Sequence, residues 1–153
     1  MPVFSSQYNA TIDDKGRVVL PSAYKRELGE AFEKGLTVEK DPYENCLNLY
    51  PVDAWEEKLR LVKSKLNPNN PDQSRFLDRF YQNFVKIPVA ENGRINIPNS
   101  FYKQKNIVRD VVFSGQGDRI RLWNASDYQK VMMSDDDFKN FFKDFLGGTQ
   151  QPL

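Results

Sequence analysis

The sequence predicts a mixed α/β fold, mainly β, in which two duplicated modules form a pseudo-symmetric β-barrel-like body with added helices. Residues 8–21 and 85–98 are similar, which indicates an internal repeat. Short runs of alternating or clustered apolar residues around polar turns indicate strands. Apolar residues at four-residue spacing indicate helices between the modules and in the tail. With 153 residues, the chain is long enough for two small modules that share one core.

The internal repeat defines the expected division of the chain. Both similar segments end in Gly-Arg-x-x-Leu/Ile-Pro, so Gly16-Arg17 corresponds to Gly93-Arg94. Four-strand modules of this size cannot each close a good core alone, so we expect the two to pair with each other. The expected units are a first module at 7–54, a helical insertion at 55–82, a second module at 83–126 and a C-terminal helical segment at 127–147.

Each module is expected to contain two strands, a short helix and two further strands. In the first module, the polar turn 14–16 lies between strands at 8–12 and 18–20, which predicts a hairpin. Pro21 suits the start of a helix. The other expected strands of the two modules are 36–39, 46–50, 111–114 and 120–123.

The insertion and the tail are expected to be helical. In the insertion, Asp53 with Glu56 resembles a capping box, and residues 67–71, rich in Pro and Asn, separate two helices. In the tail, Ser134 is suited to cap a helix whose first turn carries three aspartates. A stripe of four phenylalanines follows, which we expect in the core or in a subunit interface: Phe138, Phe141, Phe142 and Phe145.

The composition excludes several classes of function. The chain has no histidine and one cysteine, Cys46, which excludes His-based catalysis, an internal disulfide and a thiolate zinc cluster. No phosphate-binding loop, dinucleotide fingerprint or apolar pair of carboxylates occurs, so we expect no enzyme, cofactor, metal or small-molecule substrate. No apolar run is long enough for a transmembrane helix and no signal peptide is recognised, so we expect a cytoplasmic protein without membrane contact.

The sharpest local motif is the charged turn from Asp13 to Arg17. Gly16 permits a backbone conformation that other residues resist, and Lys15 and Arg17 project hydrogen-bond donors beside it. Asp13 lies four residues before Arg17, where it is suited to hold the guanidinium. This pattern is typical of phosphate or guanine contact. It also fits an ordinary charged hairpin with a surface ion pair worth about 0–1 kcal/mol, but the repeated Gly-Arg at Arg94 favours a repeating ligand.

Positive charge gathers in separate blocks although the net charge is only +1. Residues 1–26 carry a net +2 and residues 75–109 a net +5, whereas residues 27–59 carry −6. A DNA-binding chain of this kind has to bring its basic blocks together on one face. Five more basic residues are candidates for widening that face, with solvated surface charge as the equal alternative: Lys25, Arg26, Lys86, Lys103 and Lys105.

The order and spacing of these motifs resemble those of the bacterial MraZ family, which is built from two SpoVT-AbrB-type modules. The resemblance covers roughly residues 3–146. It is carried by the Asp13-x-x-x-Arg17 turn, the Cys-Leu-Asn-Leu-Tyr-Pro stretch at 46–51, and Arg94 in Gly-Arg-Ile-Asn-Ile-Pro. It implies two AbrB-like modules with swapped hairpins.

The resemblance also implies a function, that of a DNA-binding transcriptional regulator. Such a protein acts on the promoter of the division and cell-wall gene cluster, at short direct repeats. It implies a ring-like homo-oligomer associated with the nucleoid. Carried over by position, the residues that contact DNA are Asp13, Lys15, Gly16 and Arg17 in the first module and Arg94 in the second.

Two features of the sequence leave alternatives open. Ala90 stands four residues before Arg94, where the family usually has aspartate, so we expect the second turn to be the weaker DNA contact. AbrB-type modules also serve as the labile partner in toxin–antitoxin pairs, and the acidic segment 27–59 suits a basic protein partner. An antitoxin-like interaction module is therefore the alternative to a regulator.

Overall fold

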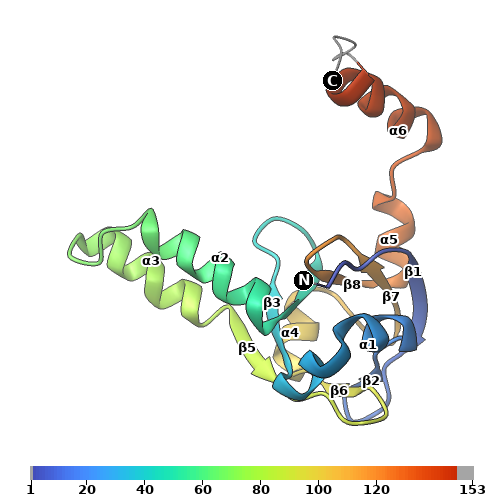
Figure 1. The fold of residues 1–153 in the computed structure, drawn as a ribbon, viewed down its shortest axis with the longest axis horizontal. Coiled ribbons are helices and arrows are strands. Elements are labelled where there is room, and N and C mark those ends of the chain that lie inside the picture. The colour runs from blue at the N-terminus through green and yellow to red at the C-terminus, as the bar shows by residue number, and fades with distance from the viewer. Residues whose placement is uncertain (1, 148–153) are drawn as a thin grey trace.

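A computed structural model describes residues 2–147 of the protein (Figure 1). The elements of the first half are β1 (Gln7–Thr11), β2 (Arg17–Val19), α1 (Ser22–Leu28), a 3₁₀ helix (Gly29–Lys34), β3 (Leu36–Lys40) and β4 (Cys46–Pro51). Pro21, with φ fixed at −51°, directly precedes α1. Lys25 and Arg26 lie in the last turn of α1, where the helix dipole favours positive charge. The order of elements is the one expected from the sequence.

The second half repeats this order of two strands, a short helix and two strands. Its elements are β5 (Phe84–Ile87), β6 (Arg94–Asn96), α4 (Asn99–Gln104), β7 (Asp110–Gly115) and β8 (Ile120–Asn124). Pro98 precedes α4 as Pro21 precedes α1. The predicted hairpin between β7 and β8 is confirmed, with Gly115 paired to Ile120 across its turn.

The two halves pair reciprocally in two antiparallel sheets. The larger sheet has the order β1-β7-β8-β4-β3-β5, and the smaller one consists of β2 and β6. The first strand of each half pairs with the third strand of the other, β1 with β7 and β5 with β3. The other strand pairs between the halves join corresponding strands, β4 with β8 and β2 with β6. Each half therefore completes the sheets of the other.

The sheets do not form the expected β-barrel-like body. The strand order of the larger sheet ends at β1 and β5, and these edges are not joined. The predicted hairpin of β1 with β2 is also wrong, because β1 pairs with β7 and β2 pairs with β6. The reason for both differences is that β2 and β6, three residues each, pair with each other and leave the larger sheet. Across the turn, N of Asp13 still donates to O of Arg17 (2.8 Å).

One hydrophobic core joins both sheets and both short helices. Its fully buried side chains include Val18 and Ile95 from the small sheet, Leu47 and Leu122 from the large sheet, and Tyr24 from α1. Burial of each such side chain contributes about 1.5–3 kcal/mol. Cys46, Trp55 and Trp123 are buried as well. The small sheet is thus fixed to the body by the same core that supports the large one.

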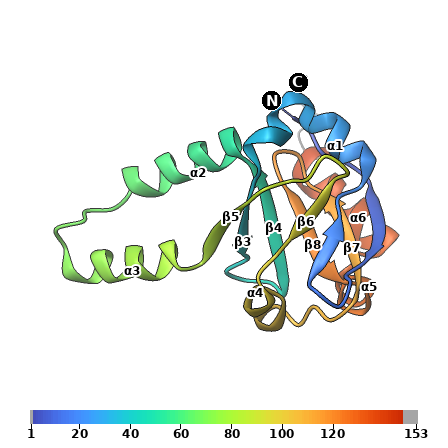
Figure 2. The ribbon, with the colours of Figure 1, turned by 90° about the horizontal axis from the view of Figure 1, so that it is seen from below.

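A helical hairpin, here called the arm, projects from the body between β4 and β5 (Figure 1, Figure 2). It consists of α2 (Val52–Ser64) and α3 (Pro71–Tyr81). The predicted capping box at its start is wrong. Helix α2 begins directly after Pro51, no side chain among residues 2–147 caps it, and Asp53 lies within its first turn. The cap is missing because β4 runs into α2 without a linker.

Buried charges attach the arm to the large sheet. Glu39 on β3 is 2% exposed, and its two oxygens accept hydrogen bonds from Nζ of Lys58 on α2 (2.9 and 2.8 Å). Although burial disfavours the Lys58 charge, the contacts with Glu39 hold its pKa above the usual value. Nδ2 of the buried Asn48 donates to Glu39 and Asp41 (2.9 and 3.1 Å). Arg121 on β8 pairs with Asp41 (3.0 Å) and completes the network.

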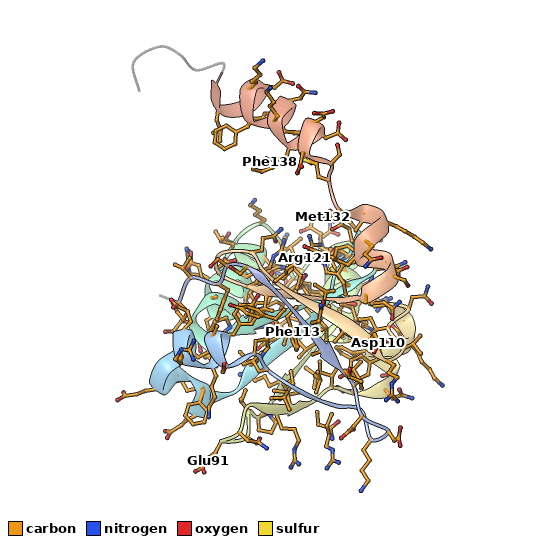
Figure 3. All side chains as sticks on the ribbon, turned by 90° about the vertical axis from the view of Figure 1, so that its right-hand side faces the viewer. Glu91, Asp110, Phe113, Arg121, Met132 and Phe138 are labelled. Atoms are coloured by element: carbon orange, nitrogen blue, oxygen red, sulfur yellow. The ribbon has the colours of Figure 1, made fainter. Side chains whose placement is uncertain are left out.

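The C-terminal part of the chain leaves the body as α5 (Ala125–Val131) and α6 (Asp135–Phe142), followed by a π-helical turn (Lys143–Gly147). Ser134 caps α6 as predicted, since its Oγ accepts a hydrogen bond from N of Asp137 (3.1 Å). The phenylalanine stripe on α6 is exposed, so its expected place in the core is wrong. Figure 3 shows Phe138 far from Phe113 in the core.

Replacing Lys58 with Met is expected to destabilise the protein by about 3 kcal/mol, because Glu39 would stay buried without its cation. The matched control is Arg60→Met, which removes an exposed ion pair with Glu57 and should cost at most about 1 kcal/mol. Urea denaturation followed by circular dichroism measures both free energies of unfolding. Equal losses in the two variants would contradict a special role for the buried pair.

Candidate nucleic-acid interface

The turn between β1 and β2 is held by one carboxylate. Oδ1 of Asp13 accepts hydrogen bonds from N of Lys15 and N of Arg17 (2.9 Å each), and Oδ2 accepts one from Nε of Arg17 (2.8 Å). Gly16 has φ +81°, a conformation that side chains disfavour, and its N donates to O of Asp13 (3.0 Å). Asp13 therefore fixes both the backbone of the turn and the direction of the Arg17 side chain.

The electrostatics of the turn favour a charged Asp13. The backbone N–H of Arg17, its guanidinium and the N–H of Lys15 hold the pKa of Asp13 below its usual value of 3.8. Within residues 2–147, the Arg17 side chain donates to Asp13 through Nε, and its two terminal nitrogens have no hydrogen-bond acceptor. Such a parallel pair of donors is what a phosphate or a guanine edge binds.

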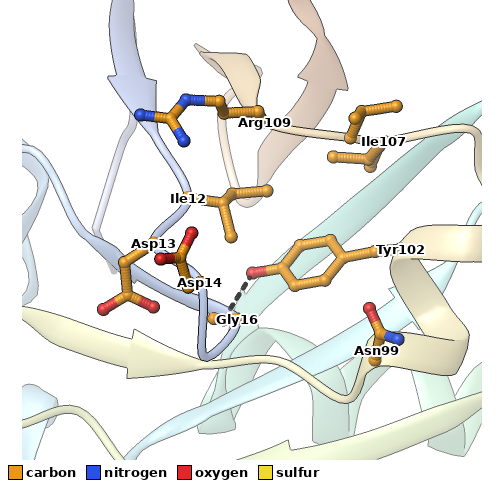
Figure 4. A pocket seen from close by; sticks show the side chains of 9 residues that line it. Ile12, Asp13, Asp14, Gly16, Asn99, Tyr102, Ile107 and Arg109 are labelled. Atoms are coloured by element: carbon orange, nitrogen blue, oxygen red, sulfur yellow. Dashed lines mark hydrogen bonds between the residues drawn. The ribbon is translucent and has the colours of Figure 1, made fainter.

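Hydrogen bonds from the second half of the chain support the first turn. Oη of Tyr102 on α4 donates to O of Gly16 (3.0 Å), and burial of this ring raises the pKa of Tyr102. N of Ile12 donates to O of Arg109 (2.9 Å). Figure 4 shows the pocket of about 310 Å³ between the turn and α4, lined by residues of both halves. The first half alone therefore does not set the position of the turn.

The second turn has the same backbone geometry but a different side-chain acceptor. N of Ala90 donates to O of Arg94 (3.0 Å), and N of Gly93, with φ +87°, donates to O of Ala90 (2.8 Å). Oδ1 of Asn92 accepts the hydrogen bond from N of Arg94 (3.0 Å). Among the described residues, Arg94 has no ion pair, and Glu91 does not replace the missing aspartate. The Arg94 guanidinium is thus less firmly oriented than that of Arg17.

Pairing of β2 with β6 brings the two turns onto one ribbon. The register pairs Arg17 with Asn96, Val18 with Ile95, and Val19 with Arg94. Val18 and Ile95 are buried, so strand alternation turns the other four side chains outward. These four residues are called the ribbon face: Arg17, Val19, Arg94 and Asn96. A two-stranded ribbon is narrow enough to enter the major groove of DNA.

Two members of the ribbon face, Val19 and Asn96, were not among the residues predicted from the sequence. The alternation within β2 and within β6 was a visible signal that both side chains share a face with the neighbouring arginine. That signal has meaning only when the partner of each strand is known. Because β2 pairs with β6 rather than with β1, a reading of each turn separately misses both residues.

The five further basic residues differ in their surroundings. Lys105 is structural, because its Nζ donates to O of Asp41 (2.5 Å) and O of Glu44 (2.8 Å), and it does not widen a positive face. Nζ of Lys25 lies 5.0 Å from the centroid of the Phe32 ring, which is a cation–π distance. The other three are exposed: Arg26, Lys86 and Lys103.

Comparison with known proteins identifies the family. The family model described as "MraZ protein, putative antitoxin-like" matches residues 3–79 and 85–145. The chain belongs to the MraZ family. Similar relatives, each named "Transcriptional regulator MraZ", come from Phocaeicola vulgatus (32% identical over 144 residues, 94% of each chain), Clostridium tetani (33% over 142 residues, 90% of this chain and 92% of the relative) and Caldanaerobacter subterraneus subsp. tengcongensis (35% over 136 residues, 85% and 87%).

Membership of the MraZ family confirms the resemblance drawn from the sequence. The relatives are named as regulators of transcription, so the family is one of regulators and not of enzymes. In the part of the chain that the structure describes, no helix combines the length and apolar character needed to cross a membrane.

The amide of Arg17 is expected to report the protonation of Asp13. Because the folded pKa of Asp13 lies below 3.8, its hydrogen bonds persist at neutral and mildly acidic pH and are lost only as pH falls through the lowered value. An NMR pH titration of this amide measures the midpoint, and Asp13→Asn is the control that lacks the transition. A midpoint above 3.8 would contradict the contacts assigned to Asp13.

Proposed function

We propose that this protein is a sequence-specific DNA-binding transcriptional regulator. The observation that carries the proposal is the ribbon face, where Arg17 and Arg94 stand outward from two strands fixed to one core. A ribbon of this kind fits the major groove, where arginine donors bind guanine, and phosphate contacts set its position. The name of the relatives, "Transcriptional regulator MraZ", supports the same function.

The two turns have unequal roles in the proposed contact. Lys15 and Arg17 of the first turn bind phosphates, and Arg17, oriented by Asp13, reaches a base edge. Gly16 gives the turn the shape that lets both side chains approach the DNA together. Within residues 2–147, Arg94 has no acidic partner to hold it, so it loses more rotamer freedom on binding and contributes less.

Assembly compensates for the small contact of a single chain. One copy offers one ribbon and a net charge of only +1, so a monomer binds DNA weakly. In our proposal a ring-like homo-oligomer presents the ribbon repeatedly and binds short direct repeats by avidity. As the resemblance to the family implies, the proposed target is the promoter of the division and cell-wall gene cluster, and the proposed location is the nucleoid.

The internal organisation supports an origin by duplication. The order of elements is the same in both halves, and their strands pair reciprocally. We infer two SpoVT-AbrB-like modules at 7–54 and 83–126, with the helical segment 55–82 inserted between them and 127–147 appended. In this arrangement the hairpins of the two modules are swapped, since neither β1 nor β5 pairs within its own half.

An antitoxin-like interaction module is the second candidate, because the family description contains the words "antitoxin-like". The acidic segment 27–59 would then bind a basic protein. Against it, Glu39 and Asp41 of this segment are already paired with Lys58 and Arg121 inside the chain, which reduces the charge available to a partner. Co-purification of one small basic protein in place of DNA would favour this candidate.

Arg17→Ala is expected to weaken binding to DNA from upstream of the protein's own gene by about tenfold or more, because it removes the oriented guanidinium. Arg94→Ala should weaken binding less. Fluorescence anisotropy at two salt concentrations measures both affinities, with scrambled DNA and Arg75→Ala, an exposed arginine of the arm, as controls. Wild-type affinity in Arg17→Ala would exclude the turn as a contact. An assembled wild type with no preference for the upstream DNA would contradict the function.

Asn96→Ala is expected to relax base preference by about tenfold at one position of the bound repeat, because a side-chain amide on the ribbon face suits an adenine edge. Anisotropy against a set of singly substituted repeats measures this. Asn45→Ala, an exposed asparagine on the turn between β3 and β4, is the control and should keep the wild-type preference. An equal loss of affinity for every sequence would assign Asn96 to the phosphate backbone instead.

A further inference from the structure

The C-terminal helix stands clear of the body. Every residue from Val131 to Leu146 is exposed. Figure 1 and Figure 3 show α6 beyond the edge of the sheets, joined to α5 by a short connection. A helix this short is marginal in water and owes its stability to packing of an apolar face. We therefore expect the apolar face of α6 to pack on a partner surface.

The surface that α6 and the π-helical turn after it offer is aromatic. The ring centroids of Phe138 and Phe142 lie 5.9 Å apart, and those of Phe141 and Phe145 lie 5.3 Å apart, so the stripe consists of two adjacent ring pairs. The four side chains are 49–67% exposed. At about 200 Å² per aromatic side chain, they leave on the order of 400 Å² of apolar surface. This is about half of what each partner buries in a standard protein interface.

The arm carries a matching apolar surface. Phe76 on α3 is 50% exposed and forms the outer end of a row of stacked rings, with Phe80 next (6.0 Å) and Trp55 at the base (6.0 Å from Phe80). Leu61 on α2 and Tyr81 on α3 are also exposed. Because Trp55 is buried, the row of rings is anchored in the body at the base of the arm.

The charges of the two surfaces are complementary. Residues 135–144 hold four aspartates and two lysines, whereas residues 60–75, at the outer part of the arm, hold four basic residues and one aspartate. Lys63 and Lys65 form no ion pair within residues 2–147, so they are available to the aspartates that begin α6. Complementary charge of this kind fixes the register of an apolar contact.

We propose that the phenylalanine stripe of α6 packs on the arm of a second copy of this chain. The second copy is required because α6 and the arm project from the body in different directions (Figure 1, Figure 2). The contact is heterologous, α6 of one copy on the arm of the next, which is the type of contact that forms a closed ring when the rotation between copies closes. This contact would be the subunit interface of the ring-like homo-oligomer, and the inference rests on the assembly part of the proposed function.

Site-specific cross-linking of the full chain tests the contact. Arg75→Cys on the arm and Lys139→Cys on α6 each introduce one exposed thiol, while Cys46 is fully buried with a pKa raised by burial to about 12 and does not react. The two variants are co-expressed, one with a cleavable tag, and treated with a short bis-maleimide. We expect a cross-link between Arg75→Cys and Lys139→Cys chains, and none when either variant is treated alone.

Three outcomes would overturn the proposal. Lys139→Cys chains that cross-link to each other would show that α6 pairs with α6. An assembled wild type without the cross-link between positions 75 and 139 would place the interface elsewhere. A cross-link of equal yield between Lys139→Cys and the control Tyr43→Cys, which is exposed on the turn between β3 and β4, would show that α6 has no preference for the arm.

Light scattering separates this inference from the rest of the function. The double variant Phe138→Ser/Phe142→Ser should assemble at least tenfold more weakly than the wild type, yet keep the cooperative unfolding of the body, because both side chains lie outside the core. Unchanged assembly would overturn the α6 contact and leave the ring intact. A monomeric wild type that still binds upstream DNA would overturn the ring and this inference but not the DNA-binding function.

Discussion

The pairing of β2 with β6 is the constraint on which the candidate interface depends. Each strand has three residues and cannot persist alone, so each turn acquires its ribbon only from the other half. Val18 and Ile95 anchor the ribbon in the core, and Tyr102 of the second half holds Gly16 of the first. A change in either half that disturbs the core therefore reaches both turns at once.

The proposed surfaces for DNA recognition and for assembly lie apart in the structure. Figure 3 shows Glu91, in the second turn, at the end of the molecule opposite Phe138 on α6. The arm lies on a third side, attached through the buried Glu39–Lys58 pair rather than through the ribbon. Contacts between copies through α6 and the arm would leave the ribbon face open, so the proposed DNA binding would not compete with the proposed assembly.

Local sequence patterns predicted the helices and strands well. The strand partners that depend on long-range pairing were not predicted. Strand alternation, Pro21 and the Ser134 cap located strands and helices because these signals depend on neighbouring residues. The barrel and the first hairpin were wrong because strand partners are chosen by burial across the whole core, which a turn sequence does not encode. Asn96 was missed for the same reason. The Asp13–Arg17 contact was predictable, since both residues lie within one turn.

In the proposed complex, DNA contacts the ribbon to which both halves contribute, and not a single turn or the acidic segment. Hydrogen–deuterium exchange of the full chain, with and without upstream DNA, tests it most directly. The account predicts that DNA slows amide exchange in residues 13–19 and in residues 90–96 together, with the arm at 52–81 unaffected. Slower exchange in residues 27–59 or along the arm, with both turns unchanged, would contradict it.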